Sequence, residues 1–207
     1  TENKSCPRAS SGISARIGYG NAYKLGAKIN GKKMEGGFGL NNSPAFTVKL
    51  GYSLNKYIEI QGDISRATNF GNSDKYSNAS GYGGLYIREW SDQLIISAYT
   101  ANLKLTIPIL LTDKVTFSPY VFGGLGRATY KAIYNEKEYY ESKWRNYSQT
   151  TRYSGNSLKV GGGVDLKVYK NIFLFSEYNY QEIRFMIDDF KIAIYHSQTI
   201  GGIGLKF

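Results

Sequence analysis

The sequence has few of the residues that build most catalytic and metal sites. Among its 207 residues there are one cysteine, Cys6, one histidine, His196, and four prolines. A single cysteine excludes a disulfide within the chain, and the usual Cys and His sets that hold zinc cannot be assembled. Asp188 and Asp189 are interpreted as a solvated turn, so we expect no metal and no cofactor. The sequence also lacks any apolar run of about 18 residues, which excludes a transmembrane helix.

Basic residues, glycine and tyrosine are abundant instead. Lysine and arginine number 26 against 16 acidic residues, which gives a formal net charge of +10, and there are 24 glycines and 19 tyrosines. A positive balance of this size favours an anionic partner such as nucleic acid, anionic lipid or another polyanion. The basic residues are divided among many segments and form no single stripe, so nucleic acid is not an expected partner.

The main structural signal is the alternation of apolar with polar or small residues, which is the period of a β-strand with two different faces. It is clear in 44–54, where Phe46, Val48, Leu50 and Tyr52 alternate with polar residues and glycine. Several segments reach about ten residues, the length that crosses a bilayer at a tilt, whereas ordinary strands have about five or six. The predicted strands are 12–20, 44–54, 57–66, 94–107, 114–127, 156–168, 171–182 and 193–207.

The connections between these strands alternate strictly in length. Those at 54–56, 108–113 and 169–171 are short, whereas the others are longer. An up-and-down barrel with one plain rim and one elaborated rim has this pattern. The predicted long connections are 21–43, 67–93 and 128–155, with a shorter one at 183–192.

Alternation alone does not say whether the apolar face lines a core, as in a water-soluble lipocalin-like barrel, or contacts lipid. The charged strand residues share the face opposite to the apolar residues, and glycine is frequent on that face. In a narrow membrane barrel these charges would fill the lumen and neutralise one another. Aromatic residues near the strand ends, among them Tyr19, Tyr99 and Tyr178, fit the interfacial girdles of a membrane barrel. The predicted lumen charges are Arg16, Lys49, Glu59, Asp63, Lys104, Lys159, Asp165, Lys167, Glu177 and Lys206.

The last residues carry a further signal. The run 200–207 alternates up to a final aromatic residue, and it resembles the C-terminal assembly signal of bacterial outer-membrane barrels. Gly202, Leu205 and Phe207 match that signal. Ile200 departs from it, because a polar residue is usual at that position.

Two internal segments, 118–126 and 175–180, resemble the fifth and seventh strands of the small eight-stranded outer-membrane proteins. That family includes the barrel of outer membrane protein A and the opacity-type adhesins. The resemblance implies an all-β fold, an eight-stranded antiparallel up-and-down transmembrane β-barrel over 12–207, after a flexible periplasmic N-terminus at 1–11. It also implies a monomeric, multi-pass protein of the bacterial outer membrane with both termini in the periplasm. Such a protein loses a secretory signal peptide and is inserted by the barrel-assembly machinery.

For a barrel of this family we expect a structural role together with surface recognition or adhesion through extracellular loops. The predicted loops are basic and rich in tyrosine, which supplies rigid contact area in recognition surfaces. The expected partners are outer-membrane lipids, lipopolysaccharide and a host or glycan ligand. The residues predicted to take part are Lys28, Lys32, Lys33, Lys131, Lys143, Trp144, Arg145 and Arg152.

Two other functions are weaker alternatives. A narrow ion pore would have to conduct past the predicted lumen charges, which block rather than open a barrel of eight strands. A lipid A-modifying enzyme needs a nucleophile and a base in reach of each other. His196 and Ser197 do not meet this need, because neighbours on a strand point to opposite faces. We therefore predict no catalytic residues.

Overall fold

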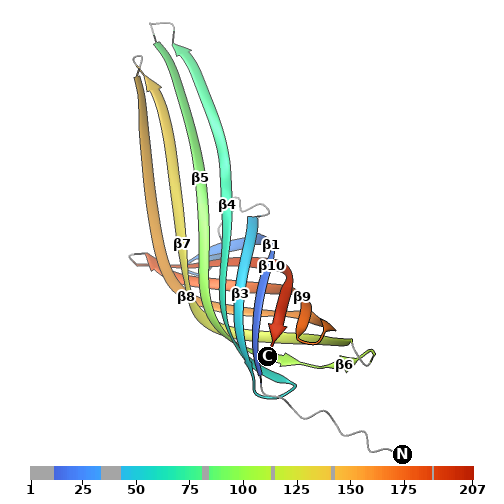
Figure 1. The fold of residues 1–207 in the computed structure, drawn as a ribbon. Coiled ribbons are helices and arrows are strands. Elements are labelled where there is room, and N and C mark those ends of the chain that lie inside the picture. Colours follow the sequence, from blue (N-terminus) through green and yellow to red (C-terminus); the bar gives the residue numbers. More distant parts are fainter. Residues whose placement is uncertain (1–11, 34–42, 81–83, 113–114, 141–142, 188) are drawn as a thin grey trace, which may run out of the picture.

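The computed structural model of the protein describes residues 12–33, 43–80, 84–112, 115–140, 143–187 and 189–207. Their regular structure is entirely β (Figure 1). No helix with the length and hydrophobicity needed to span a membrane occurs in these ranges. The strands are β1 (Gly12–Ile29), β2 (Lys32–Lys33), β3 (Ser43–Ser53), β4 (Ile58–Ser80), β5 (Gly84–Thr106), β6 (Ile109–Leu110), β7 (Thr116–Tyr140), β8 (Lys143–Tyr169), β9 (Ile172–Ile187) and β10 (Phe190–Lys206).

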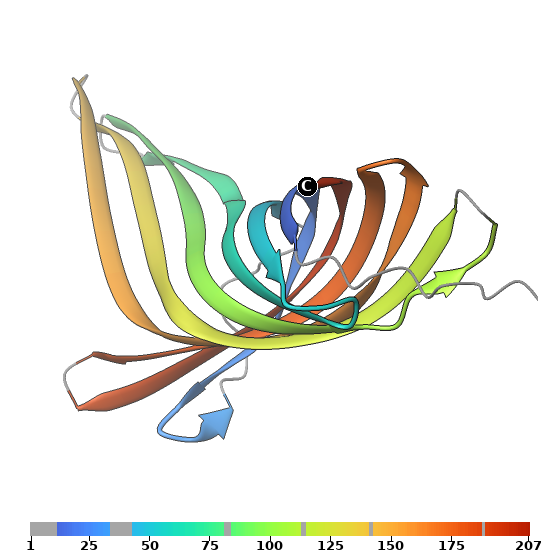
Figure 2. The ribbon, with the colours of Figure 1, turned by 60° about the horizontal axis from the view of Figure 1, so that its bottom comes forward.

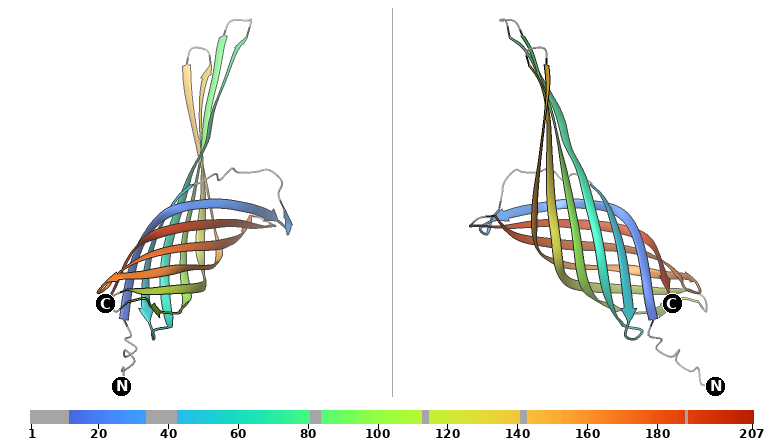
Figure 3. Two further views of the ribbon diagram at one scale, coloured as in Figure 1. Left: turned by 90° about the vertical axis from the view of Figure 1, so that its right-hand side faces the viewer. Right: turned by 60° about the vertical axis from the view of Figure 1, so that its left-hand side comes forward.

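The eight long strands form one closed antiparallel ring. Each pairs with the next long strand along the chain, and β1 pairs with β10 as well as with β3, which closes the sheet on itself. The short strands β2 and β6 are additions to the edges of β1 and β7. This arrangement confirms the predicted eight-stranded up-and-down barrel, and its antiparallel strands are visible side by side in Figure 3.

Side chains alternate between the lumen and the outside of the barrel. On β3, Leu50 is 62% exposed and Tyr52 is 51% exposed, whereas the neighbouring Lys49 is 1% exposed. The outer surface is apolar along the other strands too, for example at Ile60 and Leu103. An apolar outer band around a polar lumen is the arrangement of a barrel in lipid.

One end of the barrel has short turns. They connect β3 to β4 at 54–57 and β8 to β9 at 170–171, and the connection through β6 lies at the same end. The first strand begins here and the last one ends here, since the Phe207 N–H donates to the Ile13 carbonyl at 2.8 Å. We call this end the turn rim, and Figure 2 shows it turned toward the viewer.

At the other end four strands continue far beyond the ring. β3 pairs with β4 only as far as Ala45 and Ala67, and β8 pairs with β9 only as far as Asn156 and Arg184. The β4–β5 and β7–β8 pairs instead run on to Ser80–Gly84 and Tyr140–Lys143, and β5–β7 pairing joins them. The resulting four-stranded sheet stands above the barrel (Figure 1). We call it the protruding sheet; it comprises residues 68–80, 84–95, 128–140 and 143–155.

The protruding sheet corrects the predicted loops. Segments 67–93 and 128–155 are mostly strand, with short connections at 81–83 and 141–142 that lie outside the described residues. The strand pattern fades in these segments because most of their residues are polar, so hydrophobic alternation does not mark them. The segment 183–192 is likewise mostly strand, and 21–43 begins as a continuation of β1 to Ile29. Residues 34–42 of that segment also lie outside the described part of the chain.

The upper ends of β1, β9 and β10, together with β2, turn away from the protruding sheet and form a second, smaller layer (Figure 3). We call this layer the flap; it comprises residues 26–33, 185–187 and 190–195. An irregularity between Lys24 and Gly26, where Gly26 has a φ of +156°, interrupts the β1–β10 pairing where the flap begins.

An apolar cluster lies where the two layers diverge. Its buried members come from the inward faces of β5, β7, β9 and β10. Apolar side chains from four strands across the lumen therefore close the barrel beneath the gap between the two layers. These members are Leu94, Ile96, Ala98, Ala128, Tyr130, Ile183, Phe185 and Ile194.

Candidate functional site

Below the apolar cluster, charged side chains cross the lumen in two connected groups. In the first, Arg16 contacts Asp165 at 2.7 Å and Glu59 at 3.6 Å, and Lys104 contacts Asp165 at 2.5 Å. Ser14 donates a further hydrogen bond to Glu59 at 2.8 Å. Two bases and two acids from β1, β4, β5 and β8 thus form a chain whose formal charges cancel.

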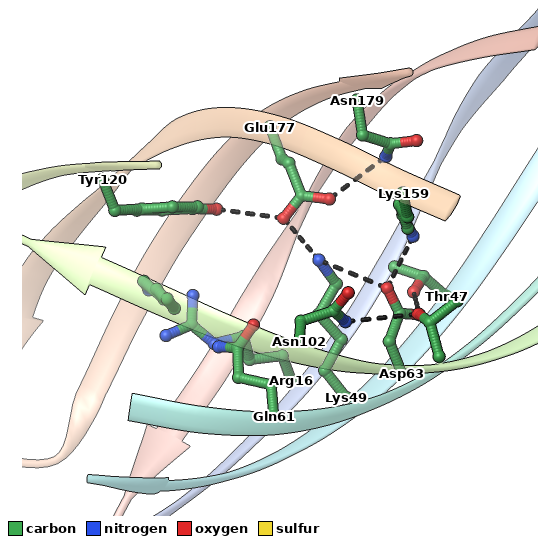
Figure 4. Close-up of polar contacts among 12 residues, drawn as sticks. Arg16, Thr47, Lys49, Gln61, Asp63, Asn102, Tyr120, Lys159, Glu177 and Asn179 are labelled. Carbon is green, nitrogen blue, oxygen red and sulfur yellow. Dashed lines mark hydrogen bonds and ion pairs between the residues drawn. The ribbon is translucent and has the colours of Figure 1, made fainter. Parts of the chain in front are cut away.

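The second group lies next to the first and also consists of two bases and two acids (Figure 4). Lys49 pairs with Glu177 and also lies 3.6 Å from Asp63. Asp63 accepts a hydrogen bond from Lys159 at 2.5 Å and another from Thr47 at 2.8 Å. These charges are almost completely buried, and buried charges are tolerated only when partners of opposite sign compensate them.

The structure places eight of the predicted charges in these two groups, together with four inward-facing rings that the sequence analysis did not predict: Tyr120, Phe122, Phe173 and Phe175. The Arg16 guanidinium lies 4.7 Å from the centre of the Phe173 ring, and the Lys104 amine lies 3.7 Å from that of Tyr120. Tyr120 also donates a hydrogen bond to Glu177 at 3.2 Å, so it contacts both charged groups. Cation–π contacts of this kind help to hold buried charges.

The remaining two predicted lumen charges, Lys167 and Lys206, lie elsewhere. Both line a cavity at the turn rim and are not buried among the ion pairs. The lumen between the rims is occupied by compensated charges and rings, and the apolar cluster lies above them. This filling gives no support to the alternative of an ion pore, because conduction requires a continuous polar path.

His196 lies inside the barrel, where it is 1% exposed. Its Nε2 is 3.4 Å from the amide nitrogen of Gln198, on the same face of β10, whereas Ser197 lies on the opposite face. No group of three or more His, Cys, Asp or Glu side chains is arranged to hold a metal ion in the part of the chain that the structure describes.

The C-terminal strand explains the departure from the assembly signal. Leu205 and Phe207 are exposed on the outer surface, as on a lipid-facing strand end. Ile200 faces inward instead and belongs to a buried apolar cluster with Phe173, Phe175 and three alanines. A polar residue at 200 would lose its water there without an evident partner, so the apolar residue fits this lumen.

On the protruding sheet, the predicted recognition residues lie on both faces of the β7–β8 hairpin. Lys131 of β7 and Arg152 of β8 are directly opposite each other, on the face that continues the outside of the barrel. Nearer the tip, Trp144 is 51% exposed and its ring centre lies 5.2 Å from that of Tyr139. Lys143 and Arg145 are exposed on the other face of the same hairpin. This end of the molecule thus combines cations with exposed aromatic side chains.

The opposite face of the protruding sheet carries an ion pair that stabilises it. Arg88 of β5 contacts Glu136 of β7 at 2.6 Å, and the Tyr134 hydroxyl donates to Glu136 at 2.8 Å. The hydrogen bond from Arg88, with that from Tyr134, holds the pKa of the Glu136 carboxyl below its ordinary value of 4.5. Glu136 is therefore ionised at neutral pH and links two strands of the sheet.

The other three predicted recognition residues lie on the flap. Lys28 of β1 pairs with Lys33 of β2, and Lys32 is their neighbour. The Lys28 amine lies 5.5 Å from the centre of the Tyr195 ring. Because the flap and the protruding sheet point in different directions (Figure 3), the structure places the predicted residues in two separate basic groups.

Comparison with solved structures finds one outer-membrane protein of similar fold and weaker matches to others. Ail, the attachment invasion locus protein of Yersinia pestis, in complex with the heparin analogue sucrose octasulfate, is 18% identical; the match covers 96% of this chain and 99% of that one, with a TM-score of 0.51. Neisserial surface protein A is 16% identical over 94% and 97% of the two chains (TM-score 0.48). The outer membrane protease OmpT of Escherichia coli is 12% identical over the full length of both (TM-score 0.40).

Sequence comparison is consistent with this fold. No curated protein matches the sequence significantly. The family model for the outer membrane protein beta-barrel domain matches residues 8–206. Because this match spans nearly all of the closed eight-stranded ring, the chain belongs to the outer membrane protein beta-barrel family, a family of the bacterial outer membrane.

Proposed function

We propose that this protein is a non-catalytic surface-recognition protein whose protruding sheet binds acidic glycans. In this proposal the barrel, a monomer inserted by the barrel-assembly machinery, fixes the sheet in the membrane. The protruding sheet faces the cell exterior and the turn rim faces the periplasm, because extracellular connections are the long ones in bacterial barrels. The ligand is a polymer with sulfate or phosphate groups, either a sulfated host glycan or the phosphorylated part of lipopolysaccharide.

The observation that carries the proposal is the direct cross-strand pairing of Lys131 with Arg152. Like charges opposite each other weaken a sheet, so their placement here needs a reason other than stability. An anionic group between the two side chains would turn the repulsion into two favourable contacts. Hydroxyl groups lie one pair further along the strands, where Thr129 and Ser154 are 3.3 Å apart, and they offer hydrogen bonds to the same ligand.

The aromatic residues at the tip suit a sugar polymer. Tyr139 and Trp144 form a contacting pair on the same face of the hairpin as Lys131 and Arg152. Aromatic side chains provide large contact surfaces at low entropic cost. A glycan chain lying along the β7–β8 hairpin would thus contact rings near the tip and cations at Lys131 and Arg152.

The ligand of a structural neighbour supports the choice of probe. Ail was solved with sucrose octasulfate, a heparin analogue. We therefore test the proposal with heparin first, and with purified lipopolysaccharide as the second source of the same chemistry.

The experiment compares two double variants of the protein in detergent micelles. K131Q/R152Q removes the cross-strand basic pair, and K32Q/K33Q makes the same change of charge on the flap. We expect K131Q/R152Q to elute from immobilised heparin at a clearly lower salt concentration, because fewer cations contact the polyanion. The control should elute like the wild type. Unchanged elution of K131Q/R152Q, or equal loss in both variants, would refute a specific site.

Lipopolysaccharide distinguishes the two ligand sources. If K131Q/R152Q loses heparin binding but retains binding to lipopolysaccharide, the sheet recognises sulfated glycans. If lipopolysaccharide binding is lost in parallel, the same pair binds phosphate groups of the outer leaflet.

A further inference from the structure

The turn rim contains a cavity of about 440 Å³ that the recognition surface does not use. Its lining includes four lysines, one from each of the β3–β4 and β8–β9 turns and one from the end of each of β8 and β10. These are Lys56, Lys170, Lys167 and Lys206. Lysines gathered from four parts of the chain around one hollow make a strongly positive entrance to the barrel.

The acidic residues of the lining do not offset this charge. They are Glu59 and Asp165, and both are engaged deeper in the lumen. Arg16 contacts each of them, and Lys104 also contacts Asp165. Glu59 and Asp165 are thus compensated within the lumen, and Lys167, Lys170 and Lys206 give the cavity a positive charge that favours an anionic ligand.

The lining of the cavity is partly apolar, and the turns around it expose many apolar side chains. Phe173, Ile58, Tyr57 and Phe207 belong to the lining, and Phe207 is 71% exposed. Exposed apolar residues accompany the lysines on the same turns, as Leu54 and Tyr57 flank Lys56 and Tyr169 precedes Lys170. A ligand that combines an anionic group with hydrocarbon matches both properties.

A third apolar feature lies beside the cavity. Thr106 and Pro108 line it, and the strand β6 that follows them exposes large side chains on both faces. Ile109 and Leu110, which point to opposite faces, are 44% and 67% exposed. Figure 2 shows the β6–β7 hairpin reaching outward from the barrel. Exposed apolar surface of this kind marks a site of interaction with membrane lipid or protein.

We propose that the turn rim is a binding site for an anionic phospholipid, whose phosphate group enters the lysine-lined cavity while its acyl chains lie over the apolar rim. With the orientation given under the proposed function, this lipid belongs to the periplasmic leaflet. The binding itself does not depend on that orientation or on glycan recognition. An anionic headgroup is favoured over a zwitterionic one, because an added ammonium group would be repelled by the lysines.

The test is native mass spectrometry of the full protein in detergent with phosphatidylglycerol or phosphatidylethanolamine added. We expect a one-to-one adduct with phosphatidylglycerol that forms at a concentration about tenfold lower than with phosphatidylethanolamine, the order of effect of charge-assisted contacts. In K167Q/K206Q this preference should disappear, and in the flap control K32Q/K33Q it should remain. K56Q/K170Q provides a second variant of the rim if K167Q/K206Q does not fold.

Three outcomes would overturn the proposal. They are an unchanged preference in the folded rim variant, equal loss in the flap control, and displacement of phosphatidylglycerol by an equal concentration of glycerol 3-phosphate. The last result would show that the cavity binds a soluble anion without acyl chains. Because none of these measurements involves heparin or intact cells, a failure here is distinct from a failure of the glycan proposal.

Discussion

Glycines in the barrel wall determine where the lumen rings fit. A Cβ at Gly204 would lie 2.1 Å from the Phe173 ring, and one at Gly163 would lie 2.3 Å from the Ser176 carbonyl oxygen and 2.8 Å from the Tyr120 ring. Neither ring can easily move away, because Phe173 lies against Arg16 and Tyr120 against Lys104. The space beside these two glycines is therefore occupied by aromatic rings. The charged side chains Arg16 and Lys104 in turn pack against those rings.

We predict that G204A destabilises the barrel by about 1–3 kcal/mol, the usual cost of overpacking. The measurement is the urea midpoint of unfolding in lipid vesicles. The double variant G204A/F173A should show a smaller cost for the added methyl group than G204A alone, since the ring that it meets is absent. As a control, G62A should change little, because its nearest neighbour would be 4.0 Å away. Equal midpoints for G204A and G62A would contradict the steric explanation.

The direction of the inward rings could not be predicted from the residues themselves. Ile172, Phe173, Leu174 and Phe175 are consecutive apolar residues, so they offer no contrast between faces. The sequence does contain one usable signal, the position of Glu177. This residue faces the lumen, and Phe175 and Phe173 lie two and four positions before it on the same strand, so they share its face. Charged residues mark a face clearly because burying them on the lipid side is costly, whereas a ring is accepted on either side.

At the scale of the element, the strands of the protruding sheet are held by pairing with their neighbours. β5 and β7 lie in its centre, and β4 and β8 form its edges above the ring. Its lower end is anchored in the apolar cluster by Leu94 and Tyr130. The strands of the ring were predictable from alternation because one face contacts lipid. The strand ends at Ser80 and Tyr140 were not, since apolar and polar residues do not alternate regularly in 68–80 and 134–140.

The Arg88–Glu136 pair should give the protruding sheet a response to acid. The pKa of Glu136 is lowered in the folded protein, so its contribution is present above the ordinary value of 4.5 and is lost as the pH falls through the lower, folded value. We predict that NMR titration of the Glu136 carboxyl gives a midpoint below 4.5. In R88Q the midpoint should rise toward 4.5, because the main hydrogen bond is absent. Identical midpoints in the two proteins would show that the contact does not persist in solution.

At the scale of the whole molecule, the two rims differ in structure and in charge environment. The turn rim combines short turns, exposed apolar side chains and four lysines around one cavity. The opposite end carries the protruding sheet, the flap and two separate basic groups. The sequence predicted both rims from loop lengths. It did not predict that the basic residues lie in two separate groups. Their separation depends on where β8 stops pairing with β9, since beyond that point β8 continues into the protruding sheet and β9 into the flap.

The orientation of the two rims can be tested with single cysteines. Asn146 is exposed on the protruding sheet and Asn171 is exposed in the β8–β9 turn, so both tolerate a small polar replacement. In a C6S background, which removes the natural thiol, we predict that a membrane-impermeant maleimide labels N146C on intact cells. N171C should react only after the outer membrane is permeabilised, because short turns of bacterial barrels face the periplasm. Labelling of N171C and protection of N146C on intact cells would reverse the orientation. The phospholipid site would then face the outer leaflet, while the binding measured in micelles would stand.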